Sequence, residues 1–293
     1  MGTNRVSQEK NYIFIMKHNI GIIGQGFVGN AIYQKFRNYF RVATFDLDET
    51  KRNTDTLDRV VKLSDVVFVC VPTPMKRVDG SCDISIVESV LEELNGVGKP
   101  IVAVIKSTIP PTTTEMFNKN FKNLTIVFNP EFLTEANAVQ DFENQSKIIL
   151  GGPREATTKL KQIYRLVFPT TPIIKTGSTH AEMVKYLTNT FLATKVAFAN
   201  EIYQICDKLS LDYDKVVEYA TYDERLGKSH WSVPGPDGDF GFGGHCFPKD
   251  LSAMLRLTEM LNTTNNVLSA TEQTNAEVRT DKDWEGMEGR AVS

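Results

Sequence analysis

Short apolar runs rich in β-branched residues alternate with helical patterns over about the first 175 residues, and this alternation constrains the fold more than any other feature of the chain. Runs such as VVFVCV and IVAVI are typical of strands that are buried on both faces of a sheet. Helical patterns between these runs include residues 29–39 and 84–94. Strands that alternate with helices predict a mostly parallel sheet with helices on both faces. We predict its strands at residues 19–23, 41–45, 66–71, 101–106, 125–128, 147–150 and 173–176.

The pattern changes at Thr179. Residues 179–209 contain no glycine or proline, and their apolar side chains recur at steps of three and four. This spacing predicts one long amphipathic helix, which either links two domains or forms a dimer interface. A shorter helix is predicted at 213–222, a loop rich in glycine and proline at 227–244, and further helices after Asp250.

A glycine-rich turn, GQGFVG, joins the first predicted strand to the first predicted helix. Gly24, Gly26 and Gly29 have the dinucleotide-binding spacing. Glycines at these positions allow a tight turn and let a pyrophosphate approach the backbone at a helix N-terminus, where unpaired N–H groups favour anions. The turn therefore predicts a dinucleotide site.

The second predicted strand ends in Asp46, where an acid is expected to hold the adenosine ribose hydroxyls. We expect NAD rather than NADP, because a carboxylate repels a 2′-phosphate, although the cations Lys51 and Arg52 act in the opposite direction. The alternative is a glycine turn followed by a solvated acid. A further ligand contact is expected at Pro72–Thr73, because ligands of open α/β sheets bind at the carboxyl ends of the strands.

These features predict an α/β protein, with a Rossmann-like doubly wound parallel sheet followed by a long-helix, all-α dimerisation and substrate domain. We expect an N-terminal extension at residues 1–16, an NAD-binding Rossmann domain at 17–178 and a helical central domain at 179–293.

The composition excludes several classes of function. A net charge of −3 argues against binding to nucleic acid, and no apolar run approaches the roughly 20 residues of a membrane span. Cys70, Cys82, Cys206 and Cys246 form no CxxC pair, which favours reduced thiols in the cytoplasm. We expect no metal site, because the only neighbouring Cys and His ligands are His245 and Cys246.

Cys246 lies in GFGGHCFPKD, between a glycine turn and a Pro-Lys-Asp sequence. Glycines let a ligand come close, and a neighbouring cation favours the reactive thiolate. These residues alone leave two interpretations open, a nucleophile and a buried structural thiol. Cys70, inside an apolar strand, is expected to pack in the core.

The chain resembles the UDP-glucose/GDP-mannose dehydrogenase family along nearly all of residues 19–255. The matching segments, in the family's order and spacing, are GQGFVG, CVPTP, DGSCDIS, IKSTIPPTTT, NPEFLTEANAVQDF, AEMVKYLTNTFLATKVAFANE, DERLG and GFGGHCFPKD. The resemblance is greatest to members that oxidise UDP-glucose at C6. It implies an NAD-dependent oxidation of a nucleotide-sugar alcohol to the carboxylate (UDP-glucose to UDP-glucuronate) in two hydride transfers, through a thiohemiacetal and a thioester on Cys246.

The resemblance also implies catalytic roles for individual residues. Cys246 corresponds to the nucleophile, and Lys185 to the lysine that stabilises oxyanions. Asn189, one helical turn after Lys185, corresponds to a substrate-binding asparagine. The alternative for Lys185 is a solvated helix lysine, and His245 corresponds to no catalytic residue of the family.

Further roles follow from the same resemblance. Glu131 corresponds to the acid linked to thioester hydrolysis, with a helix-capping acid as the alternative. Asp250 and Thr108 correspond to the pair that holds a catalytic water. Lys249 corresponds to a lysine beside the cofactor or substrate, and its alternative is a surface role. Arg225 corresponds to an arginine that reaches the substrate of a neighbouring subunit.

The resemblance also implies which residues bind the cofactor and which bind the substrate. The implied cofactor-binding residues are Gly24, Gly26, Phe27, Val28, Gly29, Asp46, Lys51, Pro72, Thr73, Thr108, Glu135 and Lys249. The implied substrate-binding residues are Glu131, Phe132, Leu133, Lys185, Asn189, Arg225, Phe242 and Gly243.

The chain departs from the family in two places. Members usually carry a further C-terminal domain that binds much of the nucleotide, and we expect this chain, which ends at Ser293, to lack it. The loop from Arg225 to Cys246 is longer than the common form. Both departures leave the substrate open. The alternatives are a GDP-mannose or UDP-N-acetylmannosamine dehydrogenase, or a non-catalytic protein that binds NAD or a nucleotide sugar.

The long helix predicts an assembly. Phe191, Val196, Phe198 and Ile202 along one side of it are expected to need partners from outside the chain. A two-fold homodimer that packs this helix against its copy would bury them and bring Arg225 to the neighbouring site.

Overall fold

The computed structural model describes residues 18–293, so the predicted N-terminal extension lies outside the described residues. The chain divides into two compact units. The first comprises the residues up to Thr73 together with Ile84–Lys185, and the second comprises Pro74–Asp83 and Tyr186–Ser293.

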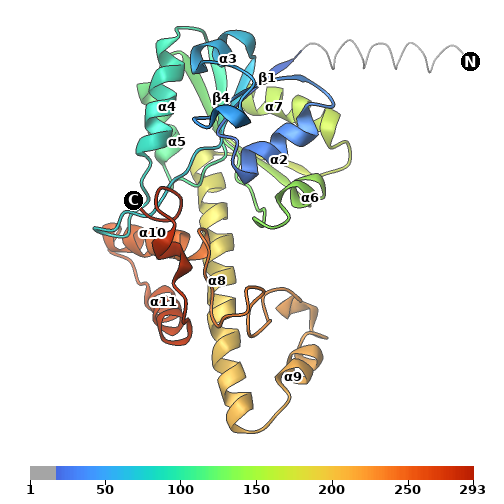
Figure 1. Cartoon of the computed structure of the whole chain (residues 1–293), viewed down its shortest axis with the longest axis vertical. Coiled ribbons are helices and arrows are strands. Elements are labelled where there is room, and N and C mark those ends of the chain that lie inside the picture. The colour runs from blue at the N-terminus through green and yellow to red at the C-terminus, as the bar shows by residue number, and fades with distance from the viewer. Residues whose placement is uncertain (1–17) are drawn as a thin grey trace, which may run out of the picture. The chain divides into compact units, whose positions relative to one another are not determined.

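The first unit is built on a seven-stranded sheet in the order β2-β1-β3-β4-β5-β6-β7. Figure 1 shows this sheet with helices packed around it. Neighbouring strands run parallel except β5 and β6, which pair antiparallel through Phe128 and Gly151. The strand bounds are β1 Asn19–Ile23, β2 Arg41–Phe45, β3 Val66–Val69, β4 Ile101–Ile105, β5 Leu124–Phe128, β6 Ile148–Gly151 and β7 Ile173–Thr176.

Helices cover both faces of this sheet, as predicted. The core on one face contains side chains from α2 (Phe27–Phe36), α6 (Ala138–Glu143) and α7 (Arg154–Val167). The core on the other contains side chains from α3 (Leu57–Leu63), α4 (Ser85–Gly96) and α5 (Thr113–Asn120). Strand β3 contributes alternate residues to the two cores, because successive side chains of a strand point to opposite faces.

The observed elements confirm the predicted sheet and correct some ends. Strands β1, β2 and β7 have the predicted bounds. Strand β3 ends at Val69, before the predicted Val71, because the chain turns towards Pro72, which has no N–H for a ladder. Helix α2 begins at Phe27 instead of Gly29, because Gly26 is its N-cap and the glycine turn opens directly into the helix.

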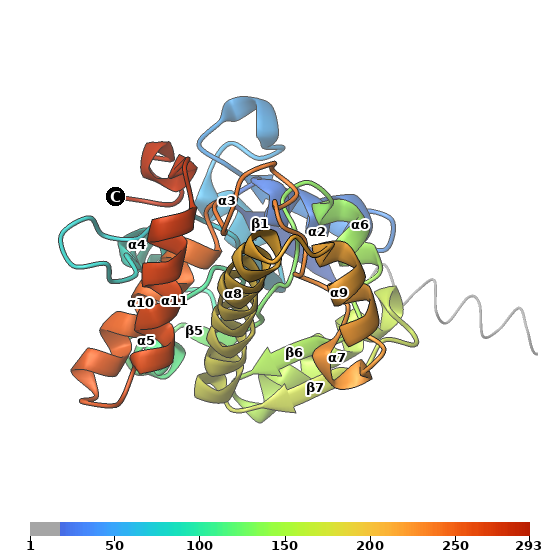
Figure 2. The same cartoon turned by 90° about the horizontal axis from the view of Figure 1, so that it is seen from below.

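The second unit is helical outside its loops. Helix α8 (Ser178–Lys208) begins in the first unit and continues through the second, close to the predicted bounds. It is followed by α9 (Tyr213–Ala220), α10 (Phe247–Met260) and α11 (Asn266–Val278), and α10 and α11 lie side by side (Figure 2). Short 3₁₀ turns are η1 (Glu49–Lys51), η2 (Glu224–Leu226) and η3 (Asp283–Gly286).

Two of the four apolar residues expected to need outside partners on α8 find them within the chain. Val196 packs against a buried cluster that includes Leu251, and Ile202 packs against another that includes Tyr213. The prediction was wrong for these two, because the second unit folds back over that side of the helix. Phe191 and Phe198 remain 66% and 52% exposed.

The segment 74–83, although it follows β3, belongs to the second unit. The N–H of Met75 donates to the carbonyl of Ala291 at 2.7 Å, and the N–H of Ser293 donates to the carbonyl of Met75 at 2.9 Å. Ala291 and Val292 are buried there. The connection between β3 and α4 is thus anchored by the last residues of the chain.

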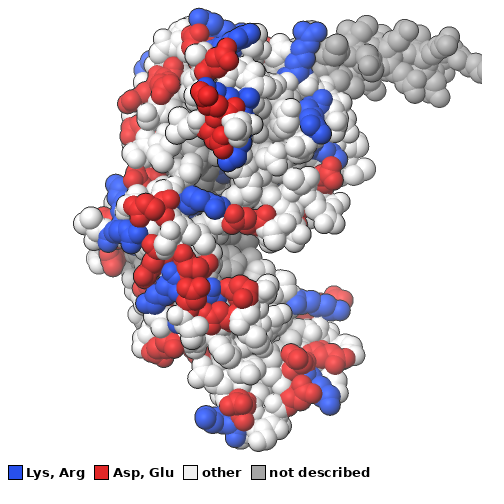
Figure 3. All heavy atoms as spheres, viewed as in Figure 1, with Lys and Arg blue, Asp and Glu red and all other residues white. Residues whose placement is uncertain are grey.

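The surface carries mixed charge. On the face shown in Figure 3, acidic and basic side chains are interspersed, which agrees with the net charge of −3. Within the described part of the chain, no helix is both long and apolar enough to span a bilayer.

Candidate active site

The glycine turn has the geometry that its sequence predicts. Gly24 has a φ of +86°, a conformation that disfavours side chains, and a Cβ there would lie 2.5 Å from the carbonyl oxygen of Cys70. A Cβ on Gly29 would lie 1.8 Å from the carbonyl oxygen of Gly24. Beside Gly26 the space is open, with no atom within 4 Å of an added Cβ. The turn is therefore tight on the protein side and open where a ligand would approach.

Asp46 lies at the carboxyl end of β2, next to this turn. Its Oδ2 accepts from the N–H of Gln25 at 2.5 Å, and its Oδ1 accepts from the N–H of Asp48 at 2.8 Å. These bonds fix the carboxylate against the glycine turn, at the end of the strand where a ribose is expected. Lys51 pairs with Asp48 at 3.1 Å.

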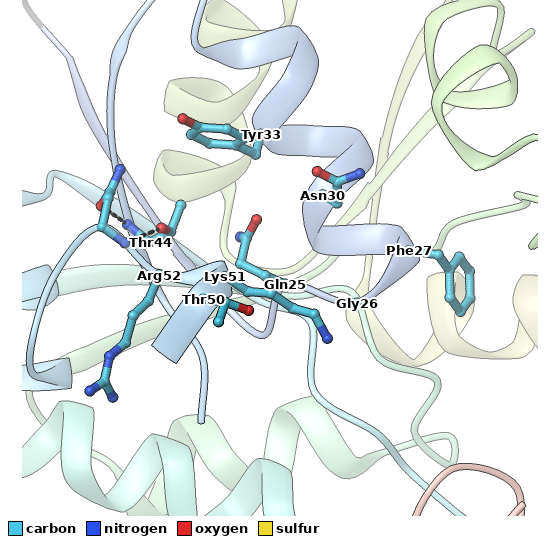
Figure 4. A pocket seen from close by; sticks show the side chains of 10 residues that line it. Gln25, Gly26, Phe27, Asn30, Tyr33, Thr44, Thr50, Lys51 and Arg52 are labelled. Atoms are coloured by element: carbon cyan, nitrogen blue, oxygen red, sulfur yellow. Dashed lines mark hydrogen bonds between the residues drawn. The ribbon is translucent and has the colours of Figure 1, made fainter. Parts of the chain in front are cut away.

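A cavity of about 620 Å³ opens beside the turn (Figure 4). Tyr33 and Asn30 extend into it from α2, whereas Phe27 points away from the other labelled side chains. Gln25 is buried, and its Nε2 has no hydrogen-bond partner in the described structure, which leaves an unsatisfied buried donor beside the turn. The lining residues are Gln25, Gly26, Phe27, Asn30, Tyr33, Thr44, Thr50, Lys51, Arg52 and Asn53.

A buried ion pair joins the segment after β5 to α8. Nζ of Lys185, on α8, lies 2.9 Å from Oε1 of Glu131 and donates to the Glu131 carbonyl at 2.7 Å. The two side chains are 4% and 7% exposed. The other carboxylate oxygen, Oε2, accepts from the N–H of Leu133 at 2.7 Å. Lys185 is thus a buried, paired lysine, and Glu131 caps no helix.

Charges around Glu131 keep it ionised. Burial alone would raise the pKa of Glu131, but Lys185, the N–H of Leu133 and Lys106 together hold that pKa below its usual value. The ring of Phe132 faces cations as well, with Nζ of Lys185 5.5 Å from its centroid. Of the predicted substrate residues, Glu131 and Phe132 therefore contact the Lys185 ammonium, and Leu133 holds the Glu131 carboxylate through its N–H.

The remaining predicted residues of the first unit lie in loops at strand ends. Thr108, two residues after Lys106, is buried. Thr73 is buried and Pro72 is exposed in the turn after β3, and Glu135 is exposed in the loop after β5.

A second buried polar cluster lies at the start of α10. Nζ of Lys249 donates to Oδ1 of Asp250, and Nδ2 of Asn189 donates to Oδ2 of the same carboxylate, each at 2.6 Å. All three side chains are buried. Burial alone would lower the pKa of Lys249, but Asp250, Cys82 and Cys246 raise it above its usual value. Lys249 is therefore held as a cation inside the protein and has no surface role.

Cys246 is the N-cap residue of α10 and is partly exposed. The N–H of Asp250 donates to its carbonyl at 2.9 Å, which places the carboxylate one turn behind the thiol. A helix N-terminus and the nearby Lys249 both favour a thiolate. None of the four cysteines is in a disulfide, and Cys70, whose pKa burial raises to about 12, packs against the core as predicted.

Arg279 clamps the glycine loop that precedes Cys246. Its side chain is 3% exposed and pairs with Asp237 at 2.7 Å and with Asp283 at 3.3 Å. Asp283 in turn accepts from the N–H of Gly244 at 3.1 Å. A Cβ on Gly243 would lie 2.3 Å from both Arg279 Nη2 and Asp283 Oδ1, so a side chain there would have to displace this ion pair. The predicted Phe242 is buried beside this loop.

Arg225 projects from the surface. Its side chain is 88% exposed and forms a forked pair with Asp223, whose Oδ1 lies 2.9 Å from Nε. The following turn is fixed to α8, because Nζ of Lys195 donates to the Leu226 carbonyl at 2.8 Å and lies 4.6 Å from the Trp231 ring centroid. Arg225 is therefore exposed to solvent on an anchored turn.

The structure brings the predicted residues together in pairs that the sequence did not indicate: Glu131 with Lys185, and Asn189 with Asp250 and Lys249. Sequence reasoning missed Lys106 and Arg279. The signal for Lys106 was its position, because a lysine that directly follows an apolar parallel strand lies at the carboxyl edge of the sheet, where ligands bind. No cluster of three or more metal-ligating residues occurs among residues 18–293.

Two family models match this chain. Residues 48–168 match the NAD-binding domain of the UDP-glucose/GDP-mannose dehydrogenase family, and residues 179–277 match its central domain.

Several known proteins are similar to it. The UDP-glucose 6-dehydrogenase TuaD of Bacillus subtilis is 32% identical over 244 residues, which cover 80% of this chain and 51% of that protein. The UDP-glucose 6-dehydrogenase of Rhizobium meliloti is 34% identical over 234 residues, or 76% of this chain and 52% of that one. The chain thus spans about half the length of these relatives.

Solved structures show the same fold. A UDP-glucose dehydrogenase from the archaeon Pyrobaculum islandicum superposes with a TM-score of 0.79 at 27% identity, covering 89% of this chain and 68% of that one. A GDP-mannose dehydrogenase from Pseudomonas aeruginosa gives a TM-score of 0.64 at 26% identity, with 88% and 68% covered. The chain belongs to the UDP-glucose/GDP-mannose dehydrogenase family, of which it carries the NAD-binding and central domains.

Proposed function

We propose that this protein oxidises the C6 alcohol of a nucleotide-linked hexose to the carboxylate, and that the hexose is the glucose of UDP-glucose. The observation that carries the proposal is the buried Glu131–Lys185 pair at the carboxyl edge of an NAD-binding sheet. A buried cation beside a carboxylate is the arrangement that stabilises an oxyanion and moves a proton. The relatives named UDP-glucose 6-dehydrogenases favour UDP-glucose among the possible sugars.

The first unit fits the cofactor. The open space beside Gly26, the fixed Asp46 carboxylate and the buried donor of Gln25 suit a pyrophosphate, a ribose and a further polar group. When bound, NAD⁺ would accept the hydride of one oxidation, so the NADH formed first has to exchange for a second NAD⁺ before the second oxidation. The residues proposed to hold it are the glycine turn with Phe27 and Val28, Asp46, Lys51, Pro72, Thr73, Thr108, Glu135 and Lys249.

The thiol of Cys246 retains the aldehyde of the first oxidation. Its sulfur bonds to the aldehyde carbon, and the former carbonyl oxygen takes a proton to give a thiohemiacetal. The second oxidation leaves a thioester on Cys246. Water then adds to the thioester carbon, the carbon–sulfur bond breaks, and the carboxylate and the thiol are released.

The buried polar residues stabilise the charges that develop in these steps and transfer the protons. Lys185 stabilises the oxyanions, and Glu131 accepts protons and directs the water. Asp250 is held by Asn189 and Lys249 one turn behind the thiol, and with Thr108 it orients the water that hydrolyses the thioester. Asn189 also binds the sugar.

We further propose a homodimer. Exposed apolar residues recur at steps of four and seven along one side of α8: Leu187, Phe191, Phe198 and Ile205 within the helix, and Leu209 directly after its last residue. We call them the α8 stripe. Packing this stripe against its copy removes it from water, at about 25 cal/mol per Å² buried, and presents Arg225 to the neighbouring substrate.

NADH production with a panel of UDP- and GDP-sugars tests the proposal. UDP-glucose should give the highest kcat/KM. A clear preference for GDP-mannose or UDP-N-acetylmannosamine would show that UDP-glucose is not the substrate, but would leave the proposed oxidation mechanism unchanged. Binding of NAD⁺ and a sugar nucleotide without any NADH would instead identify a non-catalytic binding protein and overturn the proposal.

A further inference from the structure

A second lysine, Lys106, lies buried beside the Glu131–Lys185 pair and has no role in the function proposed above. It directly follows β4 and is 3% exposed. Its N–H donates to the carbonyl of Val69, which fixes its backbone at the edge of the sheet. Nζ donates to Oδ1 of Asn129 at 3.2 Å and lies 3.5 Å from the carbonyl oxygen of Pro130. Both acceptors belong to the segment that leads into Glu131.

Asn129 makes this segment rigid. Its Oδ1 accepts from Lys106 and from the hydroxyl of Tyr164 on α7, and its Nδ2 donates to the carbonyl of Ile149 at 2.8 Å. Its own N–H donates to the carbonyl of Ile105 at 2.9 Å. Because the side-chain amide of Asn129 forms these hydrogen bonds to groups of the protein, the backbone at this residue is held in a fixed position.

Two lysines therefore form hydrogen bonds to the same segment, one at its start (residues 129–130) and one at its end (residue 131). Lys106, from β4, holds Asn129 and Pro130, while Lys185, from α8, holds the carbonyl and carboxylate of Glu131. The position of the carboxylate relative to Lys185 depends on where the turn begins, which Lys106 sets.

Four ionisable groups face Lys106 or its acceptor. Cys70 from the end of β3 and Glu131 after β5 favour its charged form, Lys185 on α8 opposes it, and Tyr164 on α7 shares the Asn129 acceptor. Burial is the strongest influence and lowers the pKa of Lys106 to about 8. A lysine with a depressed pKa costs stability at neutral pH, and residues that cost stability are expected mainly where function needs them.

We propose that Lys106 is a positioning residue for Glu131: it fixes the Asn129–Pro130 turn and adds its positive charge to that of Lys185 near the Glu131 carboxylate. The inference rests on the catalytic role proposed for Glu131. Its consequence for turnover is that loss of Lys106 lowers kcat by about tenfold to a hundredfold and changes KM much less, because a displaced group harms the chemical step.

The test follows the Glu131 carboxylate by NMR in protein labelled with ¹³C at glutamate Cδ, with Glu131→Gln to assign its signal. In Lys106→Met, which keeps the length of the side chain and removes its charge, the Glu131 titration should move to higher pH. Lys106→Arg should restore the wild-type titration. Lys99→Met is the matched control, because Nζ of Lys99 also donates to backbone carbonyls, those of Val61, Lys62 and Ser64, away from the site. It should leave Glu131 unchanged.

The wild-type protein gives a second readout if Lys106→Met does not fold. The Cε signal of Lys106 in lysine-labelled protein should titrate near pH 8 and should move to lower pH in Glu131→Gln, which removes a negative neighbour. An unchanged Lys106 midpoint in Glu131→Gln, or an unchanged Glu131 midpoint in folded Lys106→Met, would overturn the inference. Neither measurement needs substrate, so a failed sugar panel and a failed titration remain distinguishable.

Discussion

Lys185 and Glu131, 54 residues apart in the sequence, form a buried ion pair with Nζ 2.9 Å from Oε1. The lysine lies on α8 just before the helix passes into the second unit, and the acid follows β5.

Removing one partner of the pair should lower the stability of the protein. Glu131→Gln leaves an ammonium buried without a counter-charge, so we expect a loss of about 3–5 kcal/mol in the free energy of unfolding, measured in urea. The double variant Glu131→Gln, Lys185→Met should lose less than the sum of the two single variants. Additive losses would contradict a direct interaction.

The same pair predicts a pH dependence. The folded-state pKa of Glu131 is depressed, so its contribution to stability is fully present above the unfolded value of about 4.3 and is lost as pH falls through the folded value. The stability advantage of wild type over Glu131→Gln should therefore be constant from about pH 6 to 7 and shrink in acid. An advantage that persists unchanged to the acid unfolding limit would contradict the assignment.

Cofactor choice should follow Asp46. NAD⁺ should bind more tightly than NADP⁺ by about tenfold to a hundredfold, the effect of a charge clash worth about 1–3 kcal/mol. Asp46→Asn should narrow this ratio, as measured by calorimetry. Lys51→Ala provides the comparison, since Lys51 already pairs with Asp48. Equal affinities of the wild type for NAD⁺ and NADP⁺ would show that Lys51 and Arg52, and not Asp46, determine the choice of cofactor.

Assembly should depend on the α8 stripe. Phe191→Asp places a charge in the proposed interface and should yield monomers in sedimentation, whereas Gln204→Asp on another side of α8 should not. Mixing Arg225→Ala with Cys246→Ser subunits should recover part of the activity, because one site of the mixed dimer keeps both residues. A fully active monomeric wild type would exclude the composite site.

The Arg279 clamp should control access to the thiol. Arg279→Met leaves Asp237 and Asp283 without their buried cation, so stability should fall by about 3 kcal/mol and alkylation of Cys246, located by mass spectrometry, should accelerate. Arg256→Met is the control, because its partners Asp79 and Glu259 are exposed, and it should cost at most about 1 kcal/mol. Equal effects of the two variants would show that Arg279 is an ordinary surface arginine.

Local patterns were enough to predict much of the fold. The strands, the turn at Gly24–Gly29 and the bounds of α8 follow from periodicity and from glycine positions, which depend only on neighbouring residues. The reversed direction of β6 and the inclusion of residues 74–83 in the second unit depend on contacts between distant segments, on which local pattern carries no information. The partial burial of Val196 and Ile202 has the same origin.

The sequence was enough to identify most residues of the candidate site, but not the contacts between them. The motif around Cys246 and the family resemblance selected individual residues, but the pairing of Asn189 with Asp250 or of Asp283 with Gly244 requires the folded chain. The roles of Lys106 and Arg279 were missed for this reason, because their contacts with Asn129 and Pro130 and with Asp237 and Asp283 exist only in the folded chain.

The ratio of NADH formed to sugar consumed tests the covalent mechanism most directly. With UDP-glucose as the limiting substrate, each sugar should yield two NADH with no free aldehyde, because the thiol of Cys246 retains the aldehyde until the second oxidation. Cys246→Ser should bind NAD⁺ normally and form no carboxylate. One NADH per sugar with released aldehyde, or full turnover by Cys246→Ser, would contradict the account.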